Sequence, residues 1–242
     1  MRAADTLFID KGGVLVDNAQ LSGQWQRLLG EFLPSRLGRS PEDWARANRV
    51  ALGRQIARWE AAAATATGPA DVRGWFDHDG RQWLYDMCDD LAVSRPRADA
   101  ADALAAEAVR HVKAGLSFDT PHTLDRLRAL RRRGLVLHMT SGDASDDLEL
   151  YLRQIGARDL FGQVYGSDLV NTWKSSGAYY RAILAETGAD PRRTWVIDDS
   201  PRAIGWGEEC GMRGFLVTHA AGEDFEAGVL RTFDEVERAL DA

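Results

Sequence analysis

Five short apolar runs constrain the fold of this chain more than any other feature of its sequence. Each run is continuous and does not alternate between apolar and polar residues. Continuous runs are typical of strands in a parallel sheet that is covered on both faces. We therefore expect five such strands, at TLFI (6–9), LVLHM (135–139), QVYG (163–166), TWVI (194–197) and GFLVT (214–218).

Helical patterns lie between the last four of these runs. Each of them stops at a glycine, and the four glycines are Gly134, Gly156, Gly188 and Gly211. Glycine is the usual residue just past a helix end, because it adopts the left-handed conformation at low cost. Alternating strands and helices predict an α/β fold with a doubly wound parallel sheet.

Residues 18–110 have a different character. They contain several helical patterns and no convincing strand, with a break at TGPAD (67–71) and an expected loop at DHDG (77–80). We expect the tryptophans of this segment to fill a core of its own; they are Trp25, Trp44, Trp59, Trp75 and Trp83. The sequence thus predicts an all-helical domain at 18–110, inserted into an α/β domain formed by residues 1–17 and 111–242.

Composition excludes some classes of partner. The chain of 242 residues has a formal net charge of −7, and an acidic surface repels nucleic acid phosphates and anionic lipid. No apolar run approaches the roughly 18 residues that suggest a membrane span. The first residues do not resemble a signal peptide, and two cysteines fit a reducing compartment. We therefore expect a cytoplasmic protein that binds neither nucleic acid nor membrane.

Chemically suggestive residues follow three of the predicted strands. Asp10 ends the first, Thr140 and Ser141 the second, and Asp198 with Asp199 the fourth. In an open parallel sheet, ligands bind beyond the carboxyl ends of the strands. Carboxylates gathered there would repel one another unless a hard cation such as Mg²⁺ lay among them. Lys174, which precedes a helical pattern, and a nearby hydroxyl would then suit an anionic group such as phosphate.

Each of these features alone has a simpler explanation, as a turn or a helix cap, but together they resemble the motifs of the haloacid dehalogenase-like (HAD) hydrolase superfamily. The motifs are FIDKGGVLVDN with Asp10, LVLHMTSG with Thr140, WKSSGAYY with Lys174, and VIDDSPRAIGWGEECGM with Asp198 and Asp199. The helical insert after the first motif resembles the C1-type cap of that superfamily. The resemblance implies a HAD-like Rossmannoid core with an inserted all-helical cap domain.

The resemblance also implies an activity and a set of roles. Asp10 would be the nucleophile, and Thr140 and Lys174 would be the other catalytic residues. These two and Ser141 would bind the substrate phosphate. Asp10, the backbone carbonyl of Gly12, Asp198 and Asp199 would hold Mg²⁺, with Asp199 ahead of Asp198. The implied enzyme is a Mg²⁺-dependent phosphatase that hydrolyses a small phosphorylated metabolite through an aspartyl-phosphate. Monomer and homodimer remain equally open.

One departure from the motifs concerns the general acid. Phosphatases of the superfamily usually carry a second Asp two residues after the nucleophile, whereas this chain has Gly12. A general acid is typically worth about 10²–10⁴ in rate. His78 and Asp79 of the insert are our first candidates for a substitute acid. Lys11 is a poor one, because adjacent residues of an extended segment point in opposite directions.

Two other functions compete with the phosphatase. One is a metal-independent, dehalogenase-type hydrolase of the same fold, although the acidic pair at 198–199 counts against it. The other is a catalytically degenerate binding protein, which Gly12 favours and the presence of Asp10, Lys174 and both later acids disfavours.

Overall fold

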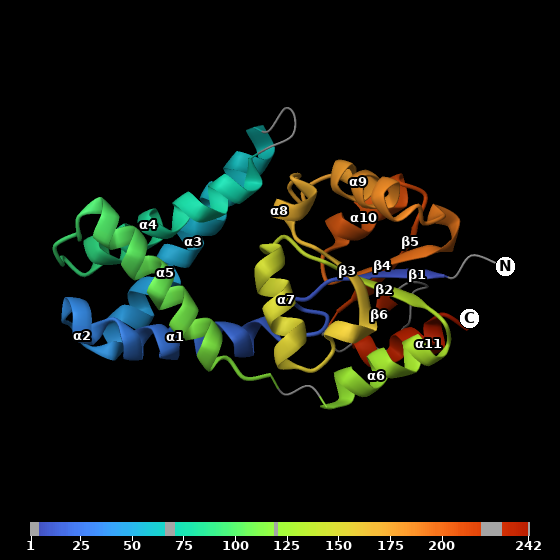
Figure 1. Cartoon of the computed structure of the whole chain (residues 1–242), viewed down its shortest axis with the longest axis horizontal. Coiled ribbons are helices and arrows are strands. Elements are labelled where there is room, and N and C mark those ends of the chain that lie inside the picture. Colours follow the sequence, from blue (N-terminus) through green and yellow to red (C-terminus); the bar gives the residue numbers. More distant parts are fainter. Residues whose placement is uncertain (1–4, 66–70, 119–120, 219–228, 242) are drawn as a thin grey trace. The chain divides into compact units, whose positions relative to one another are not determined.

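The chain folds into two compact units, here described from a computed structural model (Figure 1). The structure describes residues 5–65, 71–118, 121–218 and 229–241. One unit combines residues 1–17 with 118–242, and the other spans Asn18–Ser117. The first junction coincides with the expected one. The second comes later than the expected residue 110, because the helix α5 (Ala98–Gly115) continues past that point.

The larger unit is built on a parallel sheet of six strands in the order β3-β2-β1-β4-β5-β6. The chain runs outward from β1 in both directions, so the predicted doubly wound fold is confirmed. All five predicted strands are present within two residues of their expected bounds, and a sixth was not foreseen. Their bounds are β1 (Thr6–Ile9), β2 (Val136–Thr140), β3 (Phe161–Tyr165), β4 (Thr194–Asp198), β5 (Arg213–Val217) and β6 (Val229–Leu230).

Helices cover both faces of this sheet. In Figure 1, α9 and α10 lie on one face and α6 and α11 on the other. The four glycines predicted to end helices all have positive φ. The helices of this unit are α6 (Pro121–Arg132), α7 (Ser145–Gln154), α8 (Ser167–Val170), α9 (Gly177–Thr187), α10 (Pro201–Glu209) and α11 (Val236–Ala239), with short 3₁₀ turns η1 (Arg158–Leu160), η2 (Pro191–Arg193) and η3 (Phe233–Glu235).

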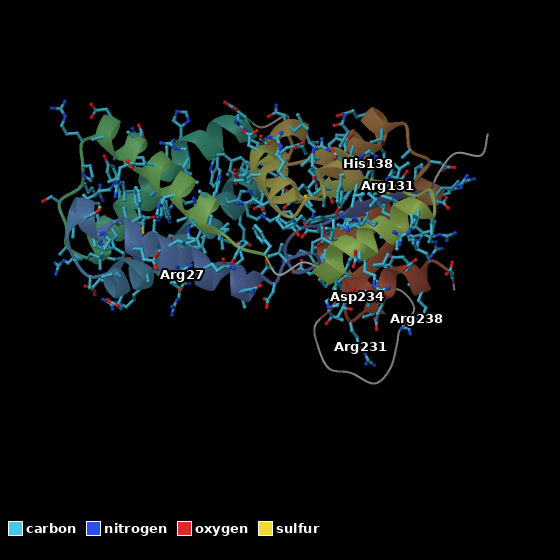
Figure 2. The ribbon with its side chains drawn as sticks, turned by 60° about the horizontal axis from the view of Figure 1, so that its bottom comes forward. Arg27, Arg131, His138, Arg231, Asp234 and Arg238 are labelled. Carbon is cyan, nitrogen blue, oxygen red and sulfur yellow. The ribbon has the colours of Figure 1, made fainter. Side chains whose placement is uncertain are left out.

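A buried histidine supports an irregularity between β2 and β3. The pairing of these strands shifts register between Leu137 and Met139, and Nδ1 of His138 accepts a hydrogen bond of 3.0 Å from the backbone N–H of Gln163. Burial, with the charge of Arg131 adding to it, lowers the pKa of His138 to about 4. Figure 2 labels both side chains. His138 is therefore a neutral core residue, as its place within a predicted strand suggested.

The smaller unit is all-helical. It comprises α1 (Asn18–Phe32), α2 (Pro34–Leu37), α3 (Pro41–Thr65), α4 (Val72–Asp90) and α5. Trp44 and Trp83 lie in its core, as expected, and Trp25 packs against that core. The two buried indoles are hydrogen-bonded, Trp44 to the carbonyl of Gly38 at 2.7 Å and Trp83 to Oδ1 of Asn48 at 2.9 Å.

Two local predictions for this unit need comment. The expected loop at 77–80 is wrong, since these residues lie within α4. Of the break predicted at 67–71, only Asp71 is among the described residues, and its side chain caps α4 by accepting a hydrogen bond of 2.8 Å from Gly74 N–H. Among the described residues, the helices are all too short or too polar to span a membrane.

Candidate active site

Three adjacent strands bring most of the predicted site residues to one edge of the sheet. Asp10 directly follows β1, Thr140 is the last residue of β2, and Asp198 is the last residue of β4. Since β1 pairs in parallel with both β2 and β4, these three residues lie at the same, carboxyl-terminal edge. The backbone N–H of Asp10 extends the sheet by donating to the carbonyl of Ile197 at 2.9 Å.

Lys174 joins these strand ends through its buried side chain. Its Nζ lies 2.7 Å from Oδ1 of Asp10 and 2.7 Å from Oδ2 of Asp198. A third contact, of 3.3 Å, reaches the carbonyl of Thr140. The contacts with Asp10 and Thr140 are hydrogen bonds, and the contact with Asp198 is an ion pair. Lys174 therefore bridges all three strands.

Burial and neighbouring charges set the protonation of this cluster. Burial raises the pKa of Asp10 to about 7, with Asp198 adding to the rise and Lys174 opposing it. Burial disfavours the Lys174 ammonium, but Asp10 and Asp198 outweigh that effect and hold the pKa of Lys174 well above its usual range. Lys174 is therefore a cation, and its charge favours the ionised form of Asp10.

Asp199 completes a group of three carboxylates with Asp10 and Asp198. One ligand atom from each lies within 4.8 Å of the others. Asp198 Oδ1 accepts a hydrogen bond of 2.9 Å from Ser200 N–H, and its Oδ2 forms the ion pair with Lys174. Asp199 is exposed, unlike the other two. With all three carboxylates ionised, one ammonium leaves a formal charge of −2, and oxygen donors are those that Mg²⁺ prefers. The donor set thus fits one Mg²⁺ ion.

The turn after Asp10 contains Gly12, which would supply the predicted carbonyl ligand and stands where the usual acid is missing. It closes on itself, since Lys11 O accepts from Leu15 N–H and Val16 N–H at 3.0 Å each. Gly13 has a φ of +70°, and an ideal Cβ on it would lie 1.9 Å from Oδ2 of Asp199. Gly13 is therefore required by conformation and by space. Gly12 is half-buried and is not among the glycines with positive φ.

The two predicted hydroxyls differ in their surroundings. Thr140 Oγ1 is buried and has no hydrogen-bond partner among the described residues. Ser141 Oγ accepts a hydrogen bond of 3.2 Å from Asp143 N–H, and Ser141 N–H donates to the carbonyl of Tyr165 at 3.0 Å. An unpartnered buried hydroxyl is costly, so Thr140 has a donor and acceptor available for a bound group.

Two tyrosines of α9 also belong to this site and were missed from the sequence. The Tyr179 hydroxyl donates to Tyr165 O at 2.6 Å, and it lies 3.4 Å from Ser141 O. The Tyr180 hydroxyl is buried without a hydrogen-bond partner among the described residues. Burial raises the pKa of Tyr180. Lys174 opposes this rise, and Asp198 and Asp10 add to it. The available signal was the pair of tyrosines at the start of the helix that follows Lys174.

Lys11, a poor candidate for the general acid from the sequence, has a partner in the structure. Its ammonium forms an ion pair with Asp143, in the segment that follows β2. The exposed fractions of the two side chains are 14% for Lys11 and 44% for Asp143. Burial disfavours the Lys11 ammonium, but Asp143, with smaller contributions from Asp147 and Asp10, outweighs that effect and raises the pKa of Lys11.

The suggested substitute acids lie in the helical unit, on α4. Asp79 is buried, and its oxygens accept hydrogen bonds of 2.8 Å from Arg58 Nε and 2.6 Å from Gln55 Nε2. This arrangement gives Asp79 a structural role. His78 is exposed.

Comparison with known proteins settles the family. The family described as haloacid dehalogenase-like hydrolase matches residues 4–211. The chain belongs to this family. Accordingly, it is a hydrolase of the HAD superfamily with the predicted Rossmann-like core. Curated protein sequences yielded no match.

Solved structures of the same fold cover nearly the whole chain. A 2-haloacid dehalogenase from Pseudomonas syringae pv. Tomato DC3000 has a TM-score of 0.69 at 16% identity, with 99% of both chains covered. YfnB from Bacillus subtilis, described as a HAD-hydrolase and solved with magnesium, has a TM-score of 0.71 at 16% identity over 100% of both chains. A Thermotoga maritima protein described as a β-phosphoglucomutase has a TM-score of 0.66 at 17% identity, with 98% of both covered. Such identities indicate a shared fold and leave the reaction open.

Proposed function

We propose that the protein is a Mg²⁺-dependent phosphatase of a small phosphorylated metabolite, with Asp10 as the nucleophile. The observation that carries this proposal is the group of three carboxylates around the Asp10–Lys174 pair. Its formal charge of −2, with all three acids ionised, would be balanced by one divalent cation. Asp10, Asp199 and the carbonyl of Gly12 would hold that cation, with Asp198 as a further oxygen donor. The bound ion would neutralise the charge that gathers when a phosphate approaches carboxylates.

The residues of the site suit an in-line attack on phosphorus. Oδ1 of Asp10 is held by Lys174, which leaves Oδ2 to attack. The new bond joins Oδ2 to phosphorus, while the bond from phosphorus to the leaving oxygen breaks and the leaving group keeps the electron pair. Thr140, whose hydroxyl has no hydrogen-bond partner among the described residues, would donate to a phosphoryl oxygen. Water would then attack the aspartyl-phosphate at phosphorus and release Asp10 as a carboxylate.

The absence of an acid at position 12 limits the substrates. No side chain there can protonate the leaving oxygen or later deprotonate the attacking water. Leaving groups that depart as stable anions, as from acyl, anomeric or aryl phosphates, should therefore react best. The second step should also be slow, so the aspartyl-phosphate should accumulate.

The alternatives are less well supported by the residues. A metal-independent hydrolase would not require three carboxylates beside one ammonium, because no cation would balance their excess negative charge. A degenerate binding protein would have no reason to keep Asp10 and Lys174 in contact at 2.7 Å.

Hydrolysis assays can separate these possibilities. We expect the wild-type protein to hydrolyse an activated aryl phosphate only with Mg²⁺, and Asp10→Asn to lose this activity while melting normally. The same samples would be given 2-chloropropionate, with released chloride measured. Chloride release without Mg²⁺ would favour the dehalogenase, and no turnover of either substrate would favour the binding protein.

A further inference from the structure

A closed ring of contacts connects Lys11 to the nucleophile Asp10. It runs from Lys11 through the residues after β2 and at the start of α8, and it returns to Asp10 through Lys174. Lys11 follows Asp10 in the chain, and its ammonium pairs with Asp143. The carbonyl of Asp143 accepts a hydrogen bond of 3.2 Å from Ser167 N–H. Oγ of Ser167 in turn accepts from Lys174 N–H at 3.2 Å, and Lys174 Nζ lies 2.7 Å from Asp10.

The segments joined by this ring are otherwise tightly held. Ser167 is fully buried. A Cβ at Gly166 would lie 2.3 Å from Ser145 N and 2.6 Å from Asp143 O, so the backbones there are in close approach. The Asp168 carboxylate also accepts from Ser145 N–H at 2.7 Å and from its hydroxyl at 2.8 Å. Residues 143–145 are therefore tightly held by their neighbours, and the Lys11–Asp143 ion pair connects the turn after Asp10 to them.

We propose that Lys11 and Asp143 form a positioning pair for the reaction at Asp10, in addition to the residues that would bind the phosphate or the metal. The pair fixes the turn that carries Asp10 and the Gly12 carbonyl against the segment that leads, through Ser167, to Lys174. A misplacement of about 1 Å at reacting atoms can cost about a hundredfold in rate. This inference rests on the proposed phosphatase function.

An effect of the pair's charges on Mg²⁺ binding differs from an effect on the position of the turn, and this difference makes the proposal testable. Removing the Lys11 cation makes the site more negative, which by itself strengthens Mg²⁺ binding. Removing the Asp143 anion has the opposite effect, and removing both restores the balance. If the pair acts by position, each single change and the double change disturb the same turn, and all three weaken Mg²⁺ binding and slow turnover.

The experiment is a double-mutant cycle of Lys11→Met, Asp143→Asn and the double variant. Each would be measured for kcat and KM on an activated aryl phosphate, for Mg²⁺ affinity by calorimetry, and for thermal melting. We expect kcat to fall about tenfold to a hundredfold in all three, with the double variant no worse than either single one. KM for the ester should change less, and Lys11→Arg should recover part of kcat.

Arg193→Met is the matched control. Arg193 pairs with Asp5 at 2.7 Å before β4 and β1, at the opposite edge of the same sheet. The Arg193→Met substitution removes an ion pair of the same unit, but it should leave kcat and Mg²⁺ affinity unchanged.

Three outcomes would overturn the proposal. The first is an active Lys11→Met variant with normal kcat. The second is tighter Mg²⁺ binding in Lys11→Met, weaker binding in Asp143→Asn and wild-type behaviour in the double variant, which is the pattern of charge alone. The third, a wild-type protein that neither turns over the ester nor binds Mg²⁺, would reject the phosphatase function together with the pair's role in it.

Discussion

The carboxylate of Asp199 fills the space that a side chain at Gly13 would need. An ideal Cβ on Gly13 lies 1.9 Å from Oδ2 of Asp199 and 2.4 Å from its Cγ, and the φ of Gly13 is +70°. The glycine turn after β1 and the acidic pair after β4 are thus fitted to each other. The glycine lets the proposed metal ligand approach the backbone that follows the nucleophile.

We predict that Gly13→Ala disables the site by displacing Asp199. Mg²⁺ affinity, measured by calorimetry, should fall at least tenfold, and turnover should fall with it. Gly134→Ala is the control, because Gly134 has a φ of +84° but nothing within 4 Å of its Cβ position. Both variants carry the cost of a left-handed alanine, roughly 1–2 kcal/mol, and only the first affects Asp199. Equal Mg²⁺ affinities in the two variants would count against this role of Gly13.

Lys174→Met should make the stability of the protein depend more strongly on Mg²⁺. Removing one partner of a buried ion pair costs about 3–5 kcal/mol, because Asp10 and Asp198 lose their common cation. A divalent cation among the carboxylates would offset part of this loss. Melting with and without Mg²⁺ should therefore show a larger shift than in the wild-type protein. Lys113→Met, in α5, should show the wild-type shift, and an Mg²⁺-insensitive Lys174→Met variant would refute the metal assignment.

The buried histidine of β2 predicts a loss of stability in acid. The pKa of His138 falls from 6.5 to about 4 on folding, so the unfolded chain takes up the proton first. The neutral His138 leaves the unfolding free energy at its full value above about pH 6.5. That free energy falls as pH falls, and the loss reaches about 3 kcal/mol by pH 4. His138→Asn keeps an acceptor for Gln163 N–H without this titration. Between pH 7 and 4, its unfolding free energy should fall less than that of the wild type.

Exposed His122, on α6, provides the control for that measurement. His122→Asn should follow the wild-type pH dependence. Identical slopes for His138→Asn and the wild type would show that His138 does not protonate on unfolding in this range.

The missing acid predicts a steep dependence of rate on the leaving group. Across phosphate monoesters of graded leaving-group pKa, the wild-type rate should fall steeply as that pKa rises. Gly12→Asp should reduce the slope, because a carboxyl group can protonate the departing oxygen. The φ of residue 12 is not positive, so its backbone conformation is one that a residue with a side chain adopts. Gly12→Asn, which has the same shape and no acid, should keep the steep slope. A shallow slope in the wild type would mean that another group supplies the proton.

Local patterns predicted the scaffold and which residues stand at the ends of its central strands. Continuous apolar runs located the five longer strands, and strand ends located Asp10, Thr140 and Asp198, because parallel strands bring their carboxyl ends to one edge. β6 has only two residues, Val229 and Leu230, which is too short for a recognisable pattern.

Features that depend on contacts between distant segments were not predictable. Asp and Gly suggested a loop at 77–80, but Asp79 is held by Arg58 and Gln55 of α3, and this packing keeps α4 helical. The boundary at 110 was set too early because α5 continues to bury residues such as Val112. The Lys11–Asp143 ion pair joins residues far apart in the chain, and no sequence period encodes it.

The central claim is that a phosphoryl group passes through Asp10 with the help of Mg²⁺. Its most direct test is mass spectrometry of protein mixed with an activated aryl phosphate and quenched in acid. We predict one phosphoryl group on the peptide that contains Asp10, formed only with Mg²⁺ and absent from Asp10→Asn. Hydrolysis of the ester without any phosphoryl group on that peptide, or with the group on another residue, would contradict the claim.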